Sequence, residues 1–160
     1  MAGELDPDRW AEENATRFPG RDAAEVALIL GIWRSAAADA AGLADVELAA
    51  PLQRHLTARG TGLPTNFALV LTAAEVIALK FDPRNSTHPL EVVPKQFGKR
   101  VESWPRGSVA LGDPDPGRMA TGLTLRIEGR DPVPCRTPKL DGNPASAAMV
   151  EALGGELPPL

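Results

Sequence analysis

Two short apolar runs, separated by four residues, constrain the fold of this chain more than any other feature of its sequence. The runs are Phe67–Leu71 and Val76–Phe81, and Thr72–Glu75 lies between them. Each run has the length and the Val, Ile and Phe content of a β-strand, and the separation suits a hairpin loop. We therefore expect a β-hairpin. A helix over Thr72–Lys80 is the alternative, because a Thr followed three residues later by a Glu also fits a helix capping box.

The length and composition predict a single soluble domain. A chain of 160 residues is long enough to bury a sizeable core. No apolar run approaches the roughly 20 residues that a membrane span needs, and the acidic N-terminus lacks the pattern of a secretory signal. Cys135 is the single cysteine and has no partner for an internal disulfide, which agrees with a reducing compartment. We expect a cytoplasmic protein.

The charge distribution argues against a nucleic-acid partner. The net charge is −4; residues 1–60 hold 6 basic and 10 acidic side chains, residues 61–107 hold 6 and 4, and residues 108–160 hold 5 and 7. Domains that bind nucleic acids are usually strongly basic, with a pI above about 9. The mildly basic middle third is compatible with a local anion site and not with general nucleic-acid binding.

The N-terminal residues are expected to form an extended or loosely docked arm. Trp10 and Phe18 are its candidate anchors on the body of the protein, because a free tail rarely exposes large aromatic side chains. We divide the chain into the arm at 1–21, a helical segment at 22–60, a β domain with a closing helix at 64–155 and a tail at 156–160.

Asp22 begins the first predicted helix. It is a favourable N-cap, and Glu25 three residues later completes a capping box. Apolar residues then recur every three or four positions, as on the buried face of an amphipathic helix. Gly42 ends the helix.

A second, shorter helix is expected from near Asp45 or Ala50 to Ala58. Pro51 lies inside this stretch and cannot occupy a helix interior without breaking it. It therefore either begins the helix in its first turn or divides it in two.

Beyond residue 64 the sequence is typical of short strands joined by turns. Besides the hairpin, we expect strands at Arg100–Trp104, Val109–Leu111, Leu123–Ile127 and Pro132–Arg136. The third of these alternates apolar and polar residues, as a strand with one buried face does. The segment Gly112–Gly117 is expected to be a turn. The last strand contains two prolines, which cannot donate ladder hydrogen bonds, so we place it at a sheet edge.

The chain is expected to close with a helix. Asn143 is a favourable N-cap and Pro144 suits the first helical position. Met149, Val150 and Leu153 give this helix an apolar face. The order of elements predicts an α+β fold, in which N-terminal helices precede an antiparallel meander or partly open barrel capped by the C-terminal helix.

This order of elements resembles the pleckstrin-homology-like (PH-like) fold of uncharacterised bacterial proteins. The resemblance rests on the hairpin, in which an apolar run and Thr72 precede a second apolar run, and on Arg100–Arg106 after a longer loop. The strand Leu123–Ile127, Gly129 and the helix after Asn143 follow in matching order. The resemblance covers about residues 64–155, with about six strand candidates. It implies a non-enzymatic binding or scaffold module with a protein or anionic ligand.

A basic group with one aromatic residue is the candidate ligand site. Its members are Lys95, Lys99, Arg100, Trp104 and Arg106. Lys and Arg suit phosphate by charge, and Arg also by its bidentate fork. The resemblance would put these residues near one end of the barrel, where an anionic lipid head group or phosphate would bind. Alternatively, the charges are solvated and limit pairing at a sheet edge, and Trp104 belongs to the core.

Two other functions stay open. A small α+β enzyme would have to assemble its site from distant residues, such as His55, His88, Asp113 and Cys135. No metal-ligand or nucleophile spacing links them, so we expect no catalytic residue, metal or cofactor. A purely structural protein would instead use the Ala-rich helix at 22–41 to associate with a helix of a protein partner.

Overall fold

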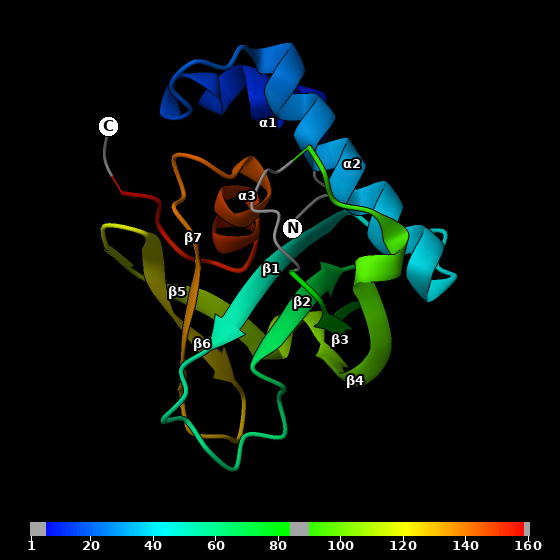
Figure 1. The fold of residues 1–160 in the computed structure, drawn as a ribbon, viewed down its shortest axis with the longest axis vertical. Coiled ribbons are helices and arrows are strands. Elements are labelled where there is room, and N and C mark those ends of the chain that lie inside the picture. Colours follow the sequence, from blue (N-terminus) through cyan, green and yellow to red (C-terminus); the bar gives the residue numbers. More distant parts are fainter. Residues whose placement is uncertain (1–5, 84–89, 159–160) are drawn as a thin grey trace.

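The computed structural model describes residues 6–83 and 90–158 and has an α+β fold with a seven-stranded antiparallel sheet (Figure 1). The helices are α1 (Pro7–Asn14), α2 (Ala23–Ala41) and α3 (Pro144–Ala152), with short 3-10 turns η1 (Ala15–Arg17), η2 (Pro94–Gln96) and η3 (Arg106–Ser108). The strands are β1 (Leu48–Arg54), β2 (Asn66–Leu71), β3 (Glu75–Phe81), β4 (Phe97–Pro105), β5 (Val109–Pro116), β6 (Ala120–Ile127) and β7 (Val133–Pro138).

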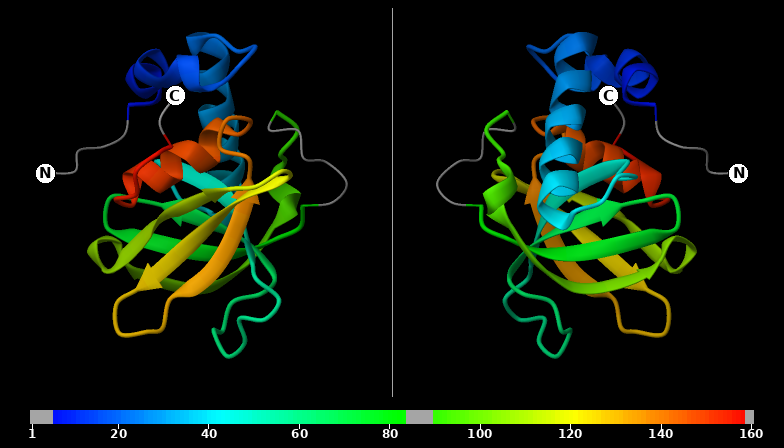
Figure 2. Two further views of the ribbon diagram at one scale, coloured as in Figure 1. Left: turned by 90° about the vertical axis from the view of Figure 1, so that its left-hand side faces the viewer. Right: turned by 90° about the vertical axis from the view of Figure 1, so that its right-hand side faces the viewer.

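The sheet consists of two meanders joined by a short ladder. Its strand order is β4-β3-β2-β1-β7-β6-β5. Strands β1 and β7 pair only at Gln53↔Arg136 and Arg54↔Cys135. Strands β4 and β5 lie at the two ends of this order, and within the described ranges no pairing joins them. The curved sheet is therefore open, with α3 lying across one end of it (Figure 2).

The predicted β-hairpin is confirmed as β2 and β3. The two strands pair antiparallel, with Leu71 opposite Val76. In the loop, the Thr72 N–H donates to the Glu75 carbonyl at 3.0 Å, and the Glu75 N–H donates to Thr72 Oγ1 at 3.0 Å. The Thr and Glu that also fitted a capping box thus close a turn, and the alternative helix over residues 72–80 is wrong.

The second predicted helix is wrong, because residues 48–54 form β1. Strand β1 pairs with β2 along its length, and Pro51 lies opposite Ala68. The Pro51 carbonyl accepts a hydrogen bond from Thr137 Oγ1 at 2.8 Å, so this residue directs its backbone groups away from β2. The N–H that proline lacks would also have pointed away from β2, so its absence breaks no β1–β2 hydrogen bond.

Our division of the chain into domains stays a prediction.

The N-terminal arm is docked, as we expected, but it is helical rather than extended. Asp6 caps α1, accepting hydrogen bonds from the backbone of Asp8 and Arg9. Trp10 and Phe18 are both buried, with ring centroids 6.0 Å apart. The Trp10 indole N–H donates to Glu151 Oε1 of α3 at 3.1 Å. Trp10 therefore attaches the arm to the closing helix, and Phe18 packs against Trp10.

Helices α2 and α3 begin where the sequence predicts. The Asp22 carboxylate accepts the Glu25 N–H at 2.8 Å, and Gly42 has the left-handed φ of 67° that ends many helices. The Asn143 side chain accepts hydrogen bonds from the backbone of Ala145 and Ser146.

Two predictions about the second meander are corrected. Most of the expected turn at residues 112–117 belongs to β5, where the register shifts between Gly112 and Asp115. The turn residues thus form an irregularity within a strand, at which Asp113 has a φ of 53°. The last strand, β7, is not at an edge, since it pairs with both β6 and β1. Pro134 fits there because its carbonyl accepts the His55 N–H at 2.9 Å just past the short β1–β7 ladder.

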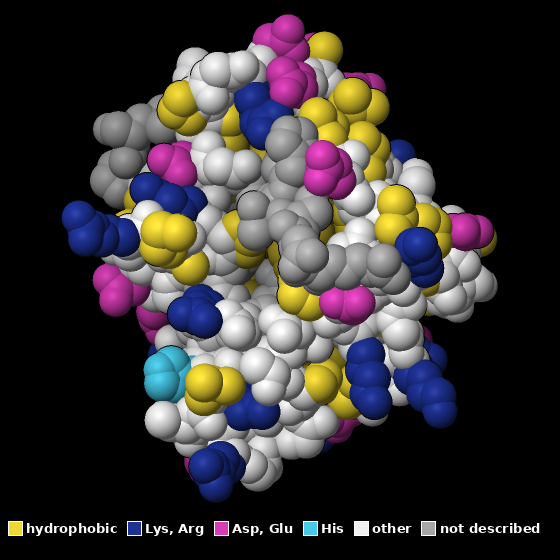
Figure 3. Space-filling model, in the orientation of Figure 1, with side chains coloured by type: hydrophobic (Ala, Val, Ile, Leu, Met, Phe, Trp, Pro, Cys, Tyr) yellow, Lys and Arg dark blue, Asp and Glu magenta, His cyan; other side chains and the backbone are white. Residues whose placement is uncertain are grey.

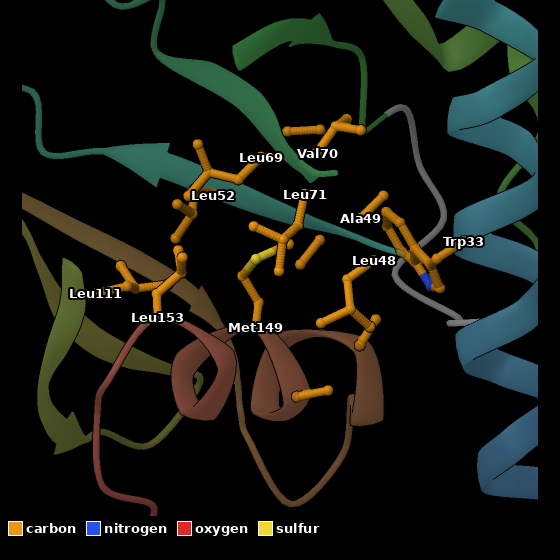
Figure 4. Packing of buried hydrophobic residues seen from close by; sticks show 14 of the residues in the cluster. Trp33, Leu48, Ala49, Leu52, Leu69, Val70, Leu71, Leu111, Met149 and Leu153 are labelled. Atoms are coloured by element: carbon orange, nitrogen blue, oxygen red, sulfur yellow. The ribbon is translucent and has the colours of Figure 1, made fainter. Parts of the chain in front are cut away.

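The core lies on both sides of β2. Its residues Phe67–Leu71 are completely buried. Met149 of α3 points toward Leu71 on the inner side of the sheet, whereas Trp33 of α2 lies beside Ala49 on the outer side (Figure 4). Trp33 also contacts Phe81 and Phe97, at centroid distances of 5.7 and 6.2 Å. Two helices on opposite faces therefore enclose the first meander.

We predict that Gly155→Ala destabilises the protein. A Cβ at this residue would lie 2.6 Å from Val150 Cγ1 and nearer still to the carbonyl oxygen of Leu111. Overpacking of this kind typically lowers the free energy of unfolding by about 1–3 kcal/mol, which urea denaturation would measure. Gly142→Ala is the matched control, because its Cβ would meet nothing closer than 3.6 Å. Equal stability of the two variants would contradict the packing of the C-terminal tail against β5.

Candidate functional site

The structure distributes the predicted basic site along an edge strand. Lys95 lies in η2, Lys99, Arg100 and Trp104 lie in β4, and Arg106 begins η3. A strand rises by about 3.3 Å per residue, which separates Lys99 from Arg106 by roughly 20 Å. The five residues are thus not gathered at one end of the sheet, and their role in ligand binding stays a prediction.

Arg106 makes a largely buried ion pair. Its guanidinium lies 2.9 Å from Glu47 Oε2, with side-chain exposures of 17% and 9%. It also donates to the Thr72 carbonyl at 3.1 Å, and the Arg106 N–H donates to the Ala74 carbonyl at 2.9 Å. These bonds fasten the end of β4 to the β2–β3 loop, so Arg106 has a structural role.

The other members of the group differ in their contacts. Arg100 pairs with Glu75 at 3.0 Å on the surface. Trp104 is buried beneath Arg130, whose guanidinium carbon lies 5.8 Å from the ring centroid and which also pairs with Glu102 of β4. Lys95 and Lys99 are exposed, and their ammonium groups have no hydrogen-bond or ion-pair partner in the described part of the chain.

The residues of the enzymatic alternative each have separate surroundings. His55 is exposed and its Nδ1 lies 2.7 Å from Thr57 Oγ1. Asp113 pairs with Arg126 at 2.7 Å, and Cys135 is buried. His88 lies outside the described residues. Within residues 6–83 and 90–158, no three His, Cys, Asp or Glu side chains are placed to hold a metal ion.

A cavity of about 400 Å³ is the feature that sequence reasoning missed. Four segments that are distant in sequence form its wall: the η1 region, the β5–β6 turn with the start of β6, the β7–α3 connection with α3, and the C-terminal tail. The lining residues are Thr16, Arg17, Pro19, Pro116, Gly117, Thr121, Lys139, Leu140, Asp141, Ala147, Leu157 and Pro158. Cavities of this size commonly hold small ligands.

The polar groups of this cavity leave donors available. Arg17 donates from Nε to Asn14 Oδ1 at 3.2 Å and from an Nη to the Pro158 carbonyl at 2.7 Å, which uses two of its five N–H groups. Lys139 and Asp141 are exposed at the rim, and neither side chain has a partner within the described ranges. Buried Thr121 accepts the Leu140 N–H at 3.3 Å. The remaining wall is mostly apolar.

No local sequence motif predicts this cavity. Arg17 precedes the anchor residue Phe18, and Lys139 and Asp141 precede the cap of α3, so each reads as an ordinary surface charge. Only the docking of the arm and of the C-terminal tail brings them to one place.

Comparisons with known proteins assign no family. No protein-family model matches the chain, and no curated protein matches it. Among solved structures, the chain is similar to the crystal structure of the complex of PDZ-RhoGEF DH/PH domains with GTP-γ-S-activated RhoA, with a TM-score of 0.38 and 12% sequence identity. The match covers 92% of this chain and 39% of that chain. A likeness this distant determines neither a fold family nor a function.

None of the helices in residues 6–83 and 90–158 is both long enough and apolar enough to span a membrane.

We predict that Arg106→Ala is far more damaging to stability than Arg100→Ala. Removing Arg106 abolishes its largely buried ion pair with Glu47 and its hydrogen bond to the Thr72 carbonyl. The loss of such charged hydrogen bonds lowers the free energy of unfolding by about 2–3 kcal/mol. Removing Arg100 breaks an exposed pair, which contributes about 0.5 kcal/mol. Chemical denaturation of both variants measures the difference. Equal effects would show that the Arg106–Glu47 pair is not structural.

We predict that Cys135 is unreactive in the folded protein. Burial raises the pKa of this thiol from 9.0 to about 12, with the nearby Arg54 charge opposing the shift. A disulfide reagent at pH 8 should therefore label it only after unfolding, because the thiolate is the reactive form. Rapid labelling of the folded chain would contradict its burial.

The same shift predicts a dependence of stability on pH. Between pH 9 and 12 the folded state keeps the thiol proton that the unfolded chain loses, so stability falls as the pH rises, by at most about 1.4 kcal/mol per pH unit. Cys135→Ala should show a shallower decline over this range.

Proposed function

We propose that the protein is a cytoplasmic, non-enzymatic binding module with a PH-like fold, and that its ligand site is the cavity beside Arg17 and Lys139. Two features of the chain support the fold assignment. The strands form a four-stranded and a three-stranded antiparallel meander, and α3 follows the last strand and packs against the inner side of the sheet.

The cavity itself carries the functional proposal, because it combines an apolar wall with hydrogen-bond donors at its rim. Leu140, Ala147 and Leu157 line its apolar part. The free N–H groups of Arg17 and the ammonium of Lys139 suit an anionic group. This pairing of an apolar wall with a few polar groups is typical of small-ligand sites. It favours an amphipathic anion over a purely ionic ligand.

The charges at the rim favour a single negative charge on the ligand. Arg17 and Lys139 contribute +2 and Asp141 contributes −1, which gives a net charge of +1. A carboxylate bound here would bring the net charge to zero, whereas a phosphate dianion would leave one negative charge uncompensated. The ligand class is therefore a carboxylate on an apolar body, either a fatty acid or the C-terminus of a protein partner.

The exposed lysines of η2 and β4 are the second candidate for anion binding. Lys95 and Lys99 are exposed, and their charges have no partner in the described residues, so they meet the electrostatic requirement for a lipid head group or phosphate. They lack the apolar wall of the cavity, and for this reason we rank them below it.

We predict that Lys139→Ala weakens the binding of a carboxylate ligand about tenfold, the change that corresponds to the loss of about 1.4 kcal/mol of binding free energy. Calorimetric titrations would use decanoate, a short peptide with a free C-terminal Leu, the same peptide amidated, and inorganic phosphate. Lys139 is exposed, so we expect the unfolding stability of this variant to stay within about 0.5 kcal/mol.

Lys99→Ala is the matched control, because it removes another exposed lysine, which lies in β4. Preference for decanoate identifies a fatty-acid site, and preference for the free peptide over its amide identifies a C-terminus. Binding of phosphate that depends on Lys99 and not on Lys139 would move the function to β4 and overturn the cavity proposal. Failure of every carboxylate to bind would also overturn it.

A further inference from the structure

Helix α2 has a second apolar side that the fold covers only in part, since Ala27 and Ile32 are partly buried. Its buried side carries Val26, Ile29, Leu30, Trp33, Ala36 and Ala37. On the opposite side, a shallow groove is lined by Ala24, Ala27, Leu28, Gly31, Ile32 and Ser35, with Asp8 of α1 at its margin. Leu28 is 55% exposed, and apolar side chains gather over α2 in Figure 3. A surface helix normally presents charged residues there.

The fold of a single chain does not explain why residue 31, in the interior of a helix, is a glycine. A glycine in a helix interior costs about 1 kcal/mol relative to alanine. Its φ is not positive, and a Cβ built on it would meet nothing within 4 Å. Neither backbone conformation nor packing within the described chain therefore requires a glycine. Its effect is to leave open space beside Leu28, into which a side chain from another molecule fits.

The residues along the middle of this side have the spacing of a helix–helix contact. Ala24, Leu28, Gly31 and Ser35 follow one another at intervals of four, three and four residues, which is the alternation of a and d positions in a coiled coil. We call these four residues the outer strip. With 3.6 residues per turn, Arg34 lies on one margin of the strip and Asp39 on the other.

These two charges identify the partner of the outer strip. Arg34 and Asp39 have no hydrogen-bond or ion-pair partner in the part of the chain that the structure describes. They are five positions apart, whereas side chains that pair within one helix are three or four apart. When two identical helices pack parallel and in register, a residue on one margin of the contact lies next to a residue on the other margin of the second helix. Arg34 of each copy would then face Asp39 of the second copy, which makes two ion pairs from one sequence. An antiparallel pair would bring like flanks together and lose both.

We propose that the protein forms a symmetric dimer through the outer strip, with the α2 helices of two copies parallel and in register. Leu28 packs against Leu28 of the second copy in the space beside the two glycines. Helix α2 is about 28 Å long, so the contact is a small interface. We therefore expect a weak dimer whose population depends on protein concentration. The proposal does not depend on a ligand in the cavity.

Sedimentation across a protein concentration range tests the dimer. Leu28→Glu should give a monomer at every concentration. At concentrations where the native protein is also monomeric, its thermal transition should be unchanged, because Leu28 is exposed in one chain. Leu56→Glu, at another exposed leucine, is the matched control and should dimerise as the native protein does. A native protein that stays monomeric up to several hundred micromolar overturns the proposal. So does a dimer that Leu28→Glu leaves intact, since another surface would then hold it.

Charge reversal tests the parallel arrangement. Arg34→Asp places an acidic residue opposite Asp39 of the second copy and should weaken the dimer about tenfold. The double variant Arg34→Asp with Asp39→Arg restores opposite charges and should recover most of the affinity. A dimer that is lost in Leu28→Glu but insensitive to both charge variants would overturn the parallel arrangement.

Discussion

The burial of strand β2 on both faces is the constraint on which the rest of the structure depends. Each residue from Phe67 to Leu71 is inaccessible to solvent, so the first meander needs a cover on either side. Helix α2 with Trp33 supplies the outer cover, and α3 with Met149 supplies the inner one. The N-terminal helix that lay outside our PH-like resemblance is therefore part of the core. The arm is attached to the inner cover in turn, because the Trp10 indole N–H donates to Glu151 of α3.

Local signals predicted the elements that carry their own caps or alternation. Asp22 with Gly42, Asn143 with Pro144, and the alternating strand at 123–127 all occur where the sequence indicates. The errors concern residues whose local preference is overridden by tertiary contacts. Residues 48–54 contain Ala, Leu, Gln and Arg, which favour helices, yet they form β1 because two neighbouring strands and α3 surround them.

The prolines of the sheet show why local rules failed there. Proline is excluded from a strand only where its missing N–H would have joined a ladder. The carbonyls of Pro51 and Pro134 face the boundary between β1 and β7, where the two strands pair at just two positions. Which side of a strand a residue faces follows from register, and register depends on the whole sheet. The cavity was unpredictable for a related reason, since Arg17, Lys139 and Leu157 meet only after both ends of the chain have docked.

The cavity and the outer strip have no residue in common, and this separation has a functional consequence. The cavity is lined by η1, the second meander, α3 and the tail, whereas the strip lies on the solvent side of α2. Dimerisation through α2 would leave the cavity of each copy open, so that one dimer would carry two ligand sites. If the ligand is the C-terminus of a protein partner that is itself multimeric, the second binding event becomes intramolecular, and the avidity exceeds the affinity of either cavity. A free fatty acid would gain nothing from the pair, so dependence of ligand affinity on dimerisation is itself a sign that the ligand is a protein.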